Sequence, residues 1–83
     1  MPLFMDTHFK VEGADSMAVA NAHMADLATQ DKYGVKYLRY WLDESSGRIF
    51  CLVEAPSKEA ASRVHQEAHG LVADEIFAVI EGS

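Results

Sequence analysis

The sequence is poor in cysteine, in basic residues and in long apolar runs. Cys51 is the only cysteine among 83 residues, so an intramolecular disulfide is impossible and a thiolate metal site is not expected. Seven basic residues stand against 13 acidic ones, and the resulting net charge of -6 repels nucleic-acid phosphates. No apolar stretch reaches the roughly 18 residues of a membrane span, and the first residues contain no basic, signal-like segment. We therefore expect a protein of the reducing cytoplasm, with neither nucleic acid nor membrane as its partner.

The length and composition indicate one small, ordered domain spanning residues 1–83. Hydrophobic residues make up 49% of the chain, and the sequence contains no linker, internal repeat or low-complexity run. A chain this short buries only about 60 to 65% of its unfolded surface. It therefore gains stability from packing one face against a partner.

The hydrophobic periodicity predicts an α+β domain with the order βαββαβ, the ferredoxin-like arrangement of two helices on one face of an antiparallel sheet. The expected elements are a strand from Pro2 to Phe9, a helix from Asp15 or Ser16 to near Asp31, strands from Val35 to Asp43 and Arg48 to Glu54, a helix from Ser57 to Gly70, and a strand from Ile76 to Ile80. In the first helix we expect one apolar stripe to face inward, formed by Met17, Ala20, Met24, Leu27 and Ala28.

The strands look apolar on both faces, although the helices cover only one. The residues expected to face the helices are Leu3, Met5, Leu38, Tyr40, Ile49, Cys51 and Val53. Those expected on the other face are Phe4, Tyr37, Trp41, Phe50 and Leu52, together with Asp6, His8, Arg39 and Glu54. Because an exposed apolar patch of this size is a liability for a monomer, we expect a homodimer in which two sheets pack face to face.

Two histidines one helical turn apart, His65 and His69, are the strongest chemical signal in the chain. At positions i and i+4 both imidazoles leave the same helix face and can bind one metal ion. Two unrelated polar residues on an exposed helix face would give the same pattern. A histidine in the last helical turn also interacts favourably with the helix dipole.

The first strand offers a second candidate site. Asp6 and His8 share one strand face, and Glu54 is expected on the neighbouring strand, so these side chains could hold another ion. An ion-paired dimer interface that includes Arg39 is the competing interpretation. His23 is expected to be a solvated helix residue, with metal ligation as the minor alternative.

Three segments of the chain together resemble a known family. They are Met5 to His8, the two strands from Tyr40 to Asp43 and Gly47 to Pro56, and the helix end from His65 to Leu71. The chain is similar to small bacterial proteins, well represented in actinomycetes, that form a domain of unknown function and include nickel-binding, nickel-responsive members. The resemblance implies a ferredoxin-like, cytosolic homodimer that binds nickel near its surface and serves in metal sequestration or detoxification.

The leading hypothesis is a non-enzymatic nickel-binding homodimer. Its expected ligands are His65 and His69, with His8 and Asp6 as a second group and with His23 and Glu54 as further candidates. Imidazole and carboxylate also bind copper and zinc, so the ligand types alone do not select nickel. One rival is a dimeric α/β-barrel enzyme or small-molecule-binding protein whose pocket is lined by His8, Asp6, Trp41 and Glu54, with His8 as general base. Another is a stress-linked interaction module without a ligand of its own.

Overall fold

The computed structural model describes residues 1–82. Four strands and two α-helices follow one another along the chain, with a short 3-10 helix after the first α-helix. Their bounds are β1 Leu3–His8, α1 Ser16–Thr29, η1 Gln30–Tyr33, β2 Lys36–Asp43, β3 Arg48–Glu54, α2 Lys58–Ala68 and β4 Glu75–Ala78. The predicted order βαββαβ is confirmed.

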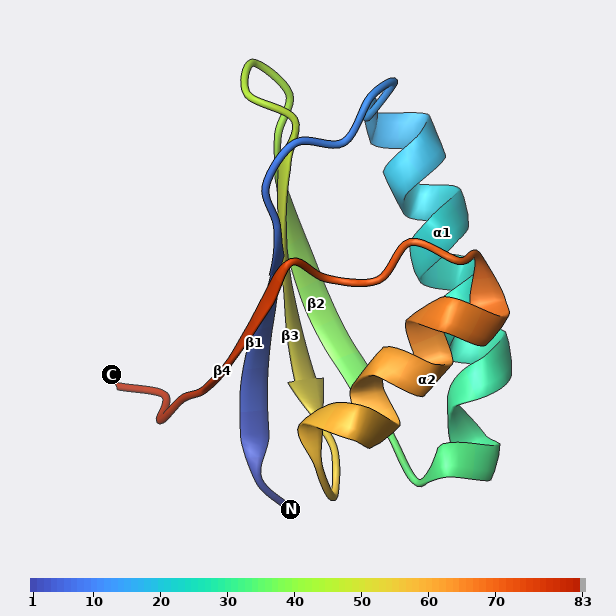
Figure 1. Cartoon of the computed structure of the whole chain (residues 1–83), viewed down its shortest axis with the longest axis vertical. Coiled ribbons are helices and arrows are strands. Elements are labelled where there is room, and N and C mark those ends of the chain that lie inside the picture. The colour runs from blue at the N-terminus through green and yellow to red at the C-terminus, as the bar shows by residue number, and fades with distance from the viewer. Residues whose placement is uncertain (83) are drawn as a thin grey trace.

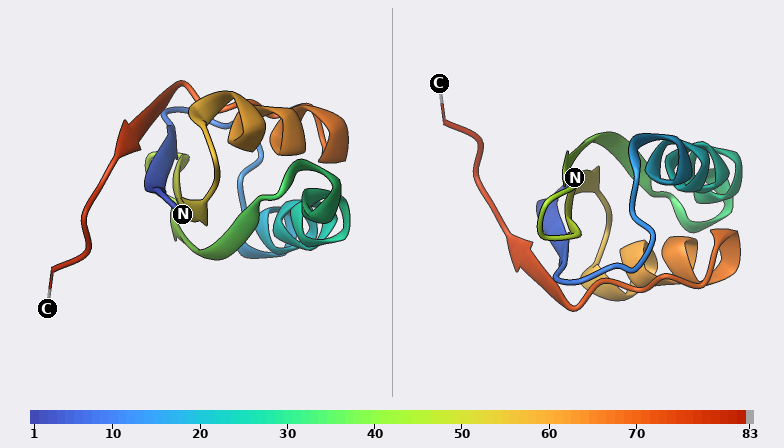
Figure 2. Two further views of the ribbon diagram at one scale, coloured as in Figure 1. Left: turned by 90° about the horizontal axis from the view of Figure 1, so that it is seen from below. Right: turned by 90° about the horizontal axis from the view of Figure 1, so that it is seen from above.

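The four strands form one antiparallel sheet in the order β2-β3-β1-β4, the strand order of the ferredoxin-like fold. Both helices lie on the same face of this sheet, and its other face is left open (Figures 1 and 2). β4 lies at the sheet edge, and the chain after it runs away from the body of the molecule (Figure 2). No helix in the part of the chain that the structure describes is long and apolar enough to cross a membrane.

Local sequence signals set the ends of both helices. The Asp15 side chain accepts a hydrogen bond from the backbone N–H of Ala18, and the Ser57 side chain accepts one from Ala60, as N-caps do. Gly70 follows α2 with a φ of 80°, a left-handed conformation that glycine adopts without steric penalty. The cap residues expected from the sequence are therefore confirmed.

The core lies between the helices and the covered face of the sheet. Val53, Ala55, Ala61 and Val64 are completely buried there, and Phe4, Ile49 and Tyr37 extend the same cluster. α2 presents Ala61, Val64 and His65 to this core. A histidine therefore occupies a core position of the helix.

The expected inward stripe of α1 is wrong. Met17 and Met24 are 74% and 65% exposed, whereas the buried residues of α1 are Val19 and Asp26. Ala22 lies between these two and lines a cavity with them. The helix therefore turns a face containing a carboxylate toward the sheet, because that carboxylate finds polar partners there.

The expected faces of β1 are inverted. Phe4, Asp6 and His8 are buried on the helix side, while Leu3 and Met5 line a groove on the open face. Asp6 and His8 therefore do not share the open face with Arg39 and Glu54. Alternation had placed Asp6 and His8 on the open face; they can lie on the covered face because each has a charged or polar partner there.

A bulge in β2 explains why two residues of this strand lie on the opposite face from the one expected. Tyr37 was expected on the open face and is buried on the helix side. Tyr37 pairs with Val53 and Tyr40 pairs with Cys51, so both tyrosines face the helices although they are three residues apart. The register shifts between Tyr37 and Arg39, which moves the alternation by one residue. Leu38 was expected inside and is 38% exposed.

Gly47, in the turn between β2 and β3, permits a close backbone contact. Its φ is 77°, and a Cβ at this position would lie 3.0 Å from the Val11 carbonyl oxygen. The Val11 N–H donates to the Gly47 carbonyl oxygen at 3.0 Å, which holds the two segments together. The turn therefore requires glycine for its dihedral angle and for space.

We expect Gly47→Ala to lower the free energy of unfolding by about 2 kcal/mol or more, since it adds a steric contact to the cost of a left-handed residue. Gly13→Ala is the matched control, because Gly13 has a φ of 72° with no atom within 4 Å of the added Cβ. It should lose only about 1 kcal/mol. Urea unfolding of the three proteins measures the difference, and equal losses would contradict the close contact.

Candidate metal centre

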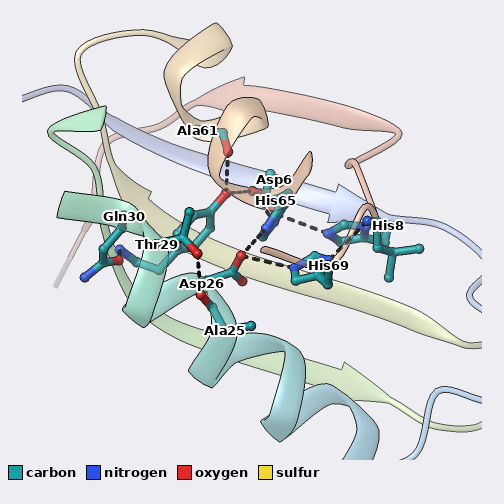
Figure 3. A network of polar contacts seen from close by, with 11 residues as sticks. Asp6, His8, Ala25, Asp26, Thr29, Gln30, Ala61, His65 and His69 are labelled. Atoms are coloured by element: carbon teal, nitrogen blue, oxygen red, sulfur yellow. Dashed lines mark hydrogen bonds and ion pairs between the residues drawn. The ribbon is translucent and has the colours of Figure 1, made fainter. Parts of the chain in front are cut away.

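Carboxylates and imidazoles from three elements meet between the helices and the sheet (Figure 3). β1 contributes Asp6 and His8, α1 contributes Asp26, α2 contributes His65, and His69 is the C-cap residue directly after α2. Alternation along β1 directs Asp6 and His8 to the same side. One helical turn separates His65 from His69 and brings both rings to the same carboxylate.

His65 lies at the centre of the cluster and contacts a carboxylate through each ring nitrogen. Its Nδ1 lies 2.9 Å from Asp26 Oδ1, and its Nε2 lies 3.0 Å from Asp6 Oδ2. Its side chain is only 2% exposed. The two carboxylates come from α1 and β1, so this one imidazole links α2 to both.

The remaining contacts position the carboxylates. The Tyr37 hydroxyl donates to Asp6 Oδ2 at 2.7 Å, and the Tyr37 ring stacks on His65 with centroids 4.6 Å apart. His69 Nε2 lies 3.1 Å from Asp26 Oδ1, and His8 Nε2 lies 3.5 Å from Asp6 Oδ1. Each carboxylate therefore meets two imidazoles.

These contacts shift the pKa values in opposite directions. Burial alone would lower the pKa of His65, but its close contacts with the Asp26 and Asp6 carboxylates outweigh burial and raise that pKa to about 9. Burial alone would raise the pKa of Asp6 and of Asp26, but the imidazoles hold both pKa values below their usual range. Without metal, the cluster at neutral pH is thus a cationic imidazole between two carboxylates.

The cluster also contains ligand atoms that lack hydrogen-bond partners. Among the described residues, the buried side-chain nitrogen and oxygen atoms without one are Asp6 Oδ1, His8 Nδ1, His65 Nε2 and His69 Nε2. His65 Nε2 and His69 Nε2 lie within ion-pair distance of Asp6 and Asp26, but these contacts lack hydrogen-bond geometry. All four atoms belong to this cluster. Buried polar atoms are normally paired, so a set of unpaired ones gathered at one place indicates a ligand or an ion.

Two overlapping groups of side chains are close enough together that they could hold a metal ion. An inner group consists of Asp6, His8, Cys51 and His65, and an outer group consists of Asp26, His65 and His69. Within each group the ligand atoms lie within 4.8 Å of one another. Ligands about 2.1 Å from an ion in tetrahedral geometry lie about 3.4 Å apart, so modest inward shifts would complete either site.

His65 belongs to both groups and decides how they combine. A neutral imidazole has one lone pair, so it binds an ion through one nitrogen while the other carries a proton. If Nε2 binds an ion together with the inner group, Nδ1–H donates to Asp26, and this hydrogen bond orients the ring as a carboxylate does in many metal sites. The inner group therefore combines several ligands with Asp26 as the residue that orients His65.

The cavity at the cluster is small. It has a volume of about 20 Å³, and its lining includes His8, Asp26, Cys51, His65 and His69. A space of this size is sufficient for a water molecule or an ion. Cavities that accept organic substrates are typically more than ten times larger.

Comparison with known proteins identifies the family. The family model described as nickel responsive protein SCO4226-like matches residues 4–79. The chain belongs to this family. It is similar to SCO4226 from Streptomyces coelicolor A3(2), whose crystal structure gives a TM-score of 0.90 at 43% identity, covering 98% of this chain and 99% of that chain. The curated proteins contain no match.

The resemblance noted in the sequence is thus confirmed, and the structure of this SCO4226-like protein revises how its candidate residues are grouped. The His65 and His69 pair and the Asp6 and His8 pair were expected at separate sites. They lie instead in one cluster, because β1 turns its polar face toward α2. The alternative interpretation, an exposed helix face with two unrelated polar residues, is wrong for His65, since its side chain is buried.

Glu54 and His23 are not part of this cluster. Glu54 lies opposite Leu3 and Lys36 in the sheet register, at the far end of β1 from His8. The pocket expected from His8, Asp6, Trp41 and Glu54 is therefore not assembled. His23 packs on Tyr40 with ring centroids 4.8 Å apart and lines the cavity, but it belongs to neither metal-binding group.

Asp26 was not among the ligands expected from the sequence, and Cys51 was not expected to bind a metal. Asp26 lies seven residues after Val19, two helical turns along the same face, so this spacing would have placed it inside only if Val19 had been taken as a core residue. Cys51 was correctly expected to be buried, and it lies directly across from Asp6 in the sheet register. Its neighbours only became evident once β1 was oriented.

The raised pKa of His65 makes the stability of the metal-free SCO4226-like protein depend on pH. A folded-state pKa of about 9 against an ordinary 6.5 gives stability that is fully present below pH 6.5 and is lost as the pH rises through 9. We expect the free energy of unfolding, measured in urea with a chelator present, to fall by up to about 3 kcal/mol between pH 6.5 and 9.5. His65→Gln should remove most of this dependence of unfolding free energy on pH. An unchanged dependence would contradict the protonation of His65 between the two carboxylates.

Proposed function

We propose that this SCO4226-like protein binds one nickel ion per chain at the buried cluster and sequesters the metal in the cytosol without catalysing a reaction. The observation that carries the proposal is the gathering of buried ligand atoms from Asp6, His8, Cys51 and His65 within 4.8 Å of one another. Within this group Asp6 Oδ1, His8 Nδ1 and His65 Nε2 have no hydrogen-bond partner. The family description, nickel responsive protein, names the metal.

The donor set fits nickel chemically. Imidazole nitrogen, carboxylate oxygen and a sulfur atom suit nickel, zinc, cobalt and copper better than they suit magnesium or calcium. Asp6, His8 and His65 would hold the ion, and Asp26 would orient His65. Because affinity for copper exceeds that for nickel at such sites, we infer that nickel is selected by its availability and not by affinity alone.

Burial supports sequestration. The side chains of His8 and His65 are 4% and 2% exposed, and that of Asp6 is fully buried. An ion held there is shielded from solvent and from other ligands. The small cavity leaves no room for a substrate beside it, so storage or detoxification suits the site better than catalysis.

Calorimetric titration of nickel into tag-free protein tests the site. We expect one ion per chain for the wild type, and a loss of at least 100-fold in affinity for His65→Gln and for His8→Gln, since each removes a nitrogen ligand. His8→Gln lies at the end of β1 and provides a second variant if His65→Gln fails to fold.

His23→Gln and Glu54→Gln serve as matched controls, because they make the same kinds of substitution outside both metal-binding groups. We expect the affinity of each to stay within threefold of the wild type. A loss as large as that of His65→Gln would place the ion elsewhere. No heat from the wild type with nickel, zinc or cobalt would reject the proposal.

We also propose that two chains pair through their open sheet faces. A groove of about 400 Å³ crosses this face between Leu3, Met5, Trp41, Leu52 and the chain after β4. Trp41 is 47% exposed and Phe77 is 48% exposed. Apolar side chains gathered on one face are a common feature of homodimer interfaces.

The mass in solution tests this pairing. We expect light scattering to give twice 9.2 kDa for the wild type and 9.2 kDa for Trp41→Glu, because a charge would be buried in the interface. Met17→Glu is the control, since it places the same charge on an exposed apolar residue of α1. A monomeric wild type, or equal dissociation by both variants, would contradict pairing through the sheet.

A further inference from the structure

We propose that His69 is a transient ligand that loads the ion: the outer group of Asp26, His65 and His69 receives nickel first and passes it to the inner group. This inference rests on the proposed function, because it describes how an ion reaches the buried cluster. It assigns to His69 control over rates of binding and release, with little effect on final affinity.

Exposure differs across the cluster in the direction that such a route requires. The side chain of His69 is 15% exposed, whereas those of His8, His65 and Asp26 are 4%, 2% and 3% exposed. The cavity is lined by residues of both groups, among them His8, Cys51, Asp26 and His69, and by the exposed Leu71. An ion arriving from solvent would meet the ring of His69, the most exposed of these ligands, first.

The two groups are joined through the ring of His65. Its Nδ1 faces Asp26 and the outer group, and its Nε2 faces Asp6 and the inner group. Since a neutral imidazole binds through one nitrogen at a time, the two positions exclude each other. An ion moving inward leaves Nδ1, which takes up a proton, and joins Nε2, which gives one up to solvent or to a carboxylate.

A hydrogen bond at the end of α2 makes His69 unsuitable as a permanent ligand. The Leu71 N–H donates to His69 Nδ1 at 3.1 Å, so Nδ1 bears the lone pair and Nε2 bears the proton of the neutral ring. Nε2, which faces Asp26, can therefore bind an ion only if the proton moves to Nδ1 and breaks this bond. Passing the ion to the inner group restores the bond.

The variant His69→Asn separates two properties of this residue: the acceptance of the hydrogen bond from the Leu71 N–H, and the presence of Nε2 as a metal ligand. The asparagine side-chain oxygen can still accept from the backbone N–H two residues ahead, as in an Asx turn, but the Nε2 atom is lost. Rapid mixing of the full chain with nickel chloride, followed by intrinsic fluorescence, measures loading, and transfer to excess chelator measures release. We expect both rates to fall at least tenfold, with a dissociation constant within threefold of the wild type.

Gln66→Asn is the matched control, because Gln66 is an exposed residue of the same helix and belongs to neither metal-binding group. Its rates should equal those of the wild type. Faster release and weaker binding in His69→Asn would make His69 a permanent ligand, and unchanged rates would give it no part in loading; either result overturns the inference. If His69→Asn fails to fold, His69→Gln is measured instead. Failure of the wild type to bind nickel would reject the proposed function itself.

Discussion

The structure depends on one buried imidazole shared by two carboxylates. His65 contacts Asp6 and Asp26 at 3.0 and 2.9 Å, and these three residues come from α2, β1 and α1. Two carboxylates buried alone would repel each other and would lose their hydration. Packing both helices on this sheet therefore requires a positive charge between the two carboxylates. A proton on His65 supplies it, and a bound metal ion could replace that proton.

Much of the fold was readable from the sequence, because the signals for it are local. The caps at Asp15 and Ser57, the turn at Gly47 and the strand Arg48–Glu54 follow from residue types over a few positions. Antiparallel order and the placement of both helices on one face then follow from the connections. None of these inferences required knowledge of which side chains are buried.

The site was only partly readable, because its burial depends on partners that are distant in sequence. Asp6 and Asp26 look like surface residues until His65, 39 residues beyond Asp26, is placed between them. Alternation alone does not say which face of β1 the helices cover, and the helix pattern favours apolar residues inside, so β1 was inverted and the wrong stripe of α1 was chosen. Wrong assignments of buried faces are expected where polar residues are buried for a site, because local sequence patterns then conflict with the fold.

The bulge in β2 determines what lies beneath the cluster. It directs both Tyr37 and Tyr40 toward the helices, where the first hydrogen-bonds to Asp6 and the second packs on His23. Deleting a single residue at Leu38 would restore strict alternation and turn one of these rings to the opposite face. The placement of the Tyr37 and Tyr40 rings beside the cluster thus depends on the length of β2 as much as on residue identity. A homologue with one residue fewer here would lose one of these two rings from the surroundings of the cluster.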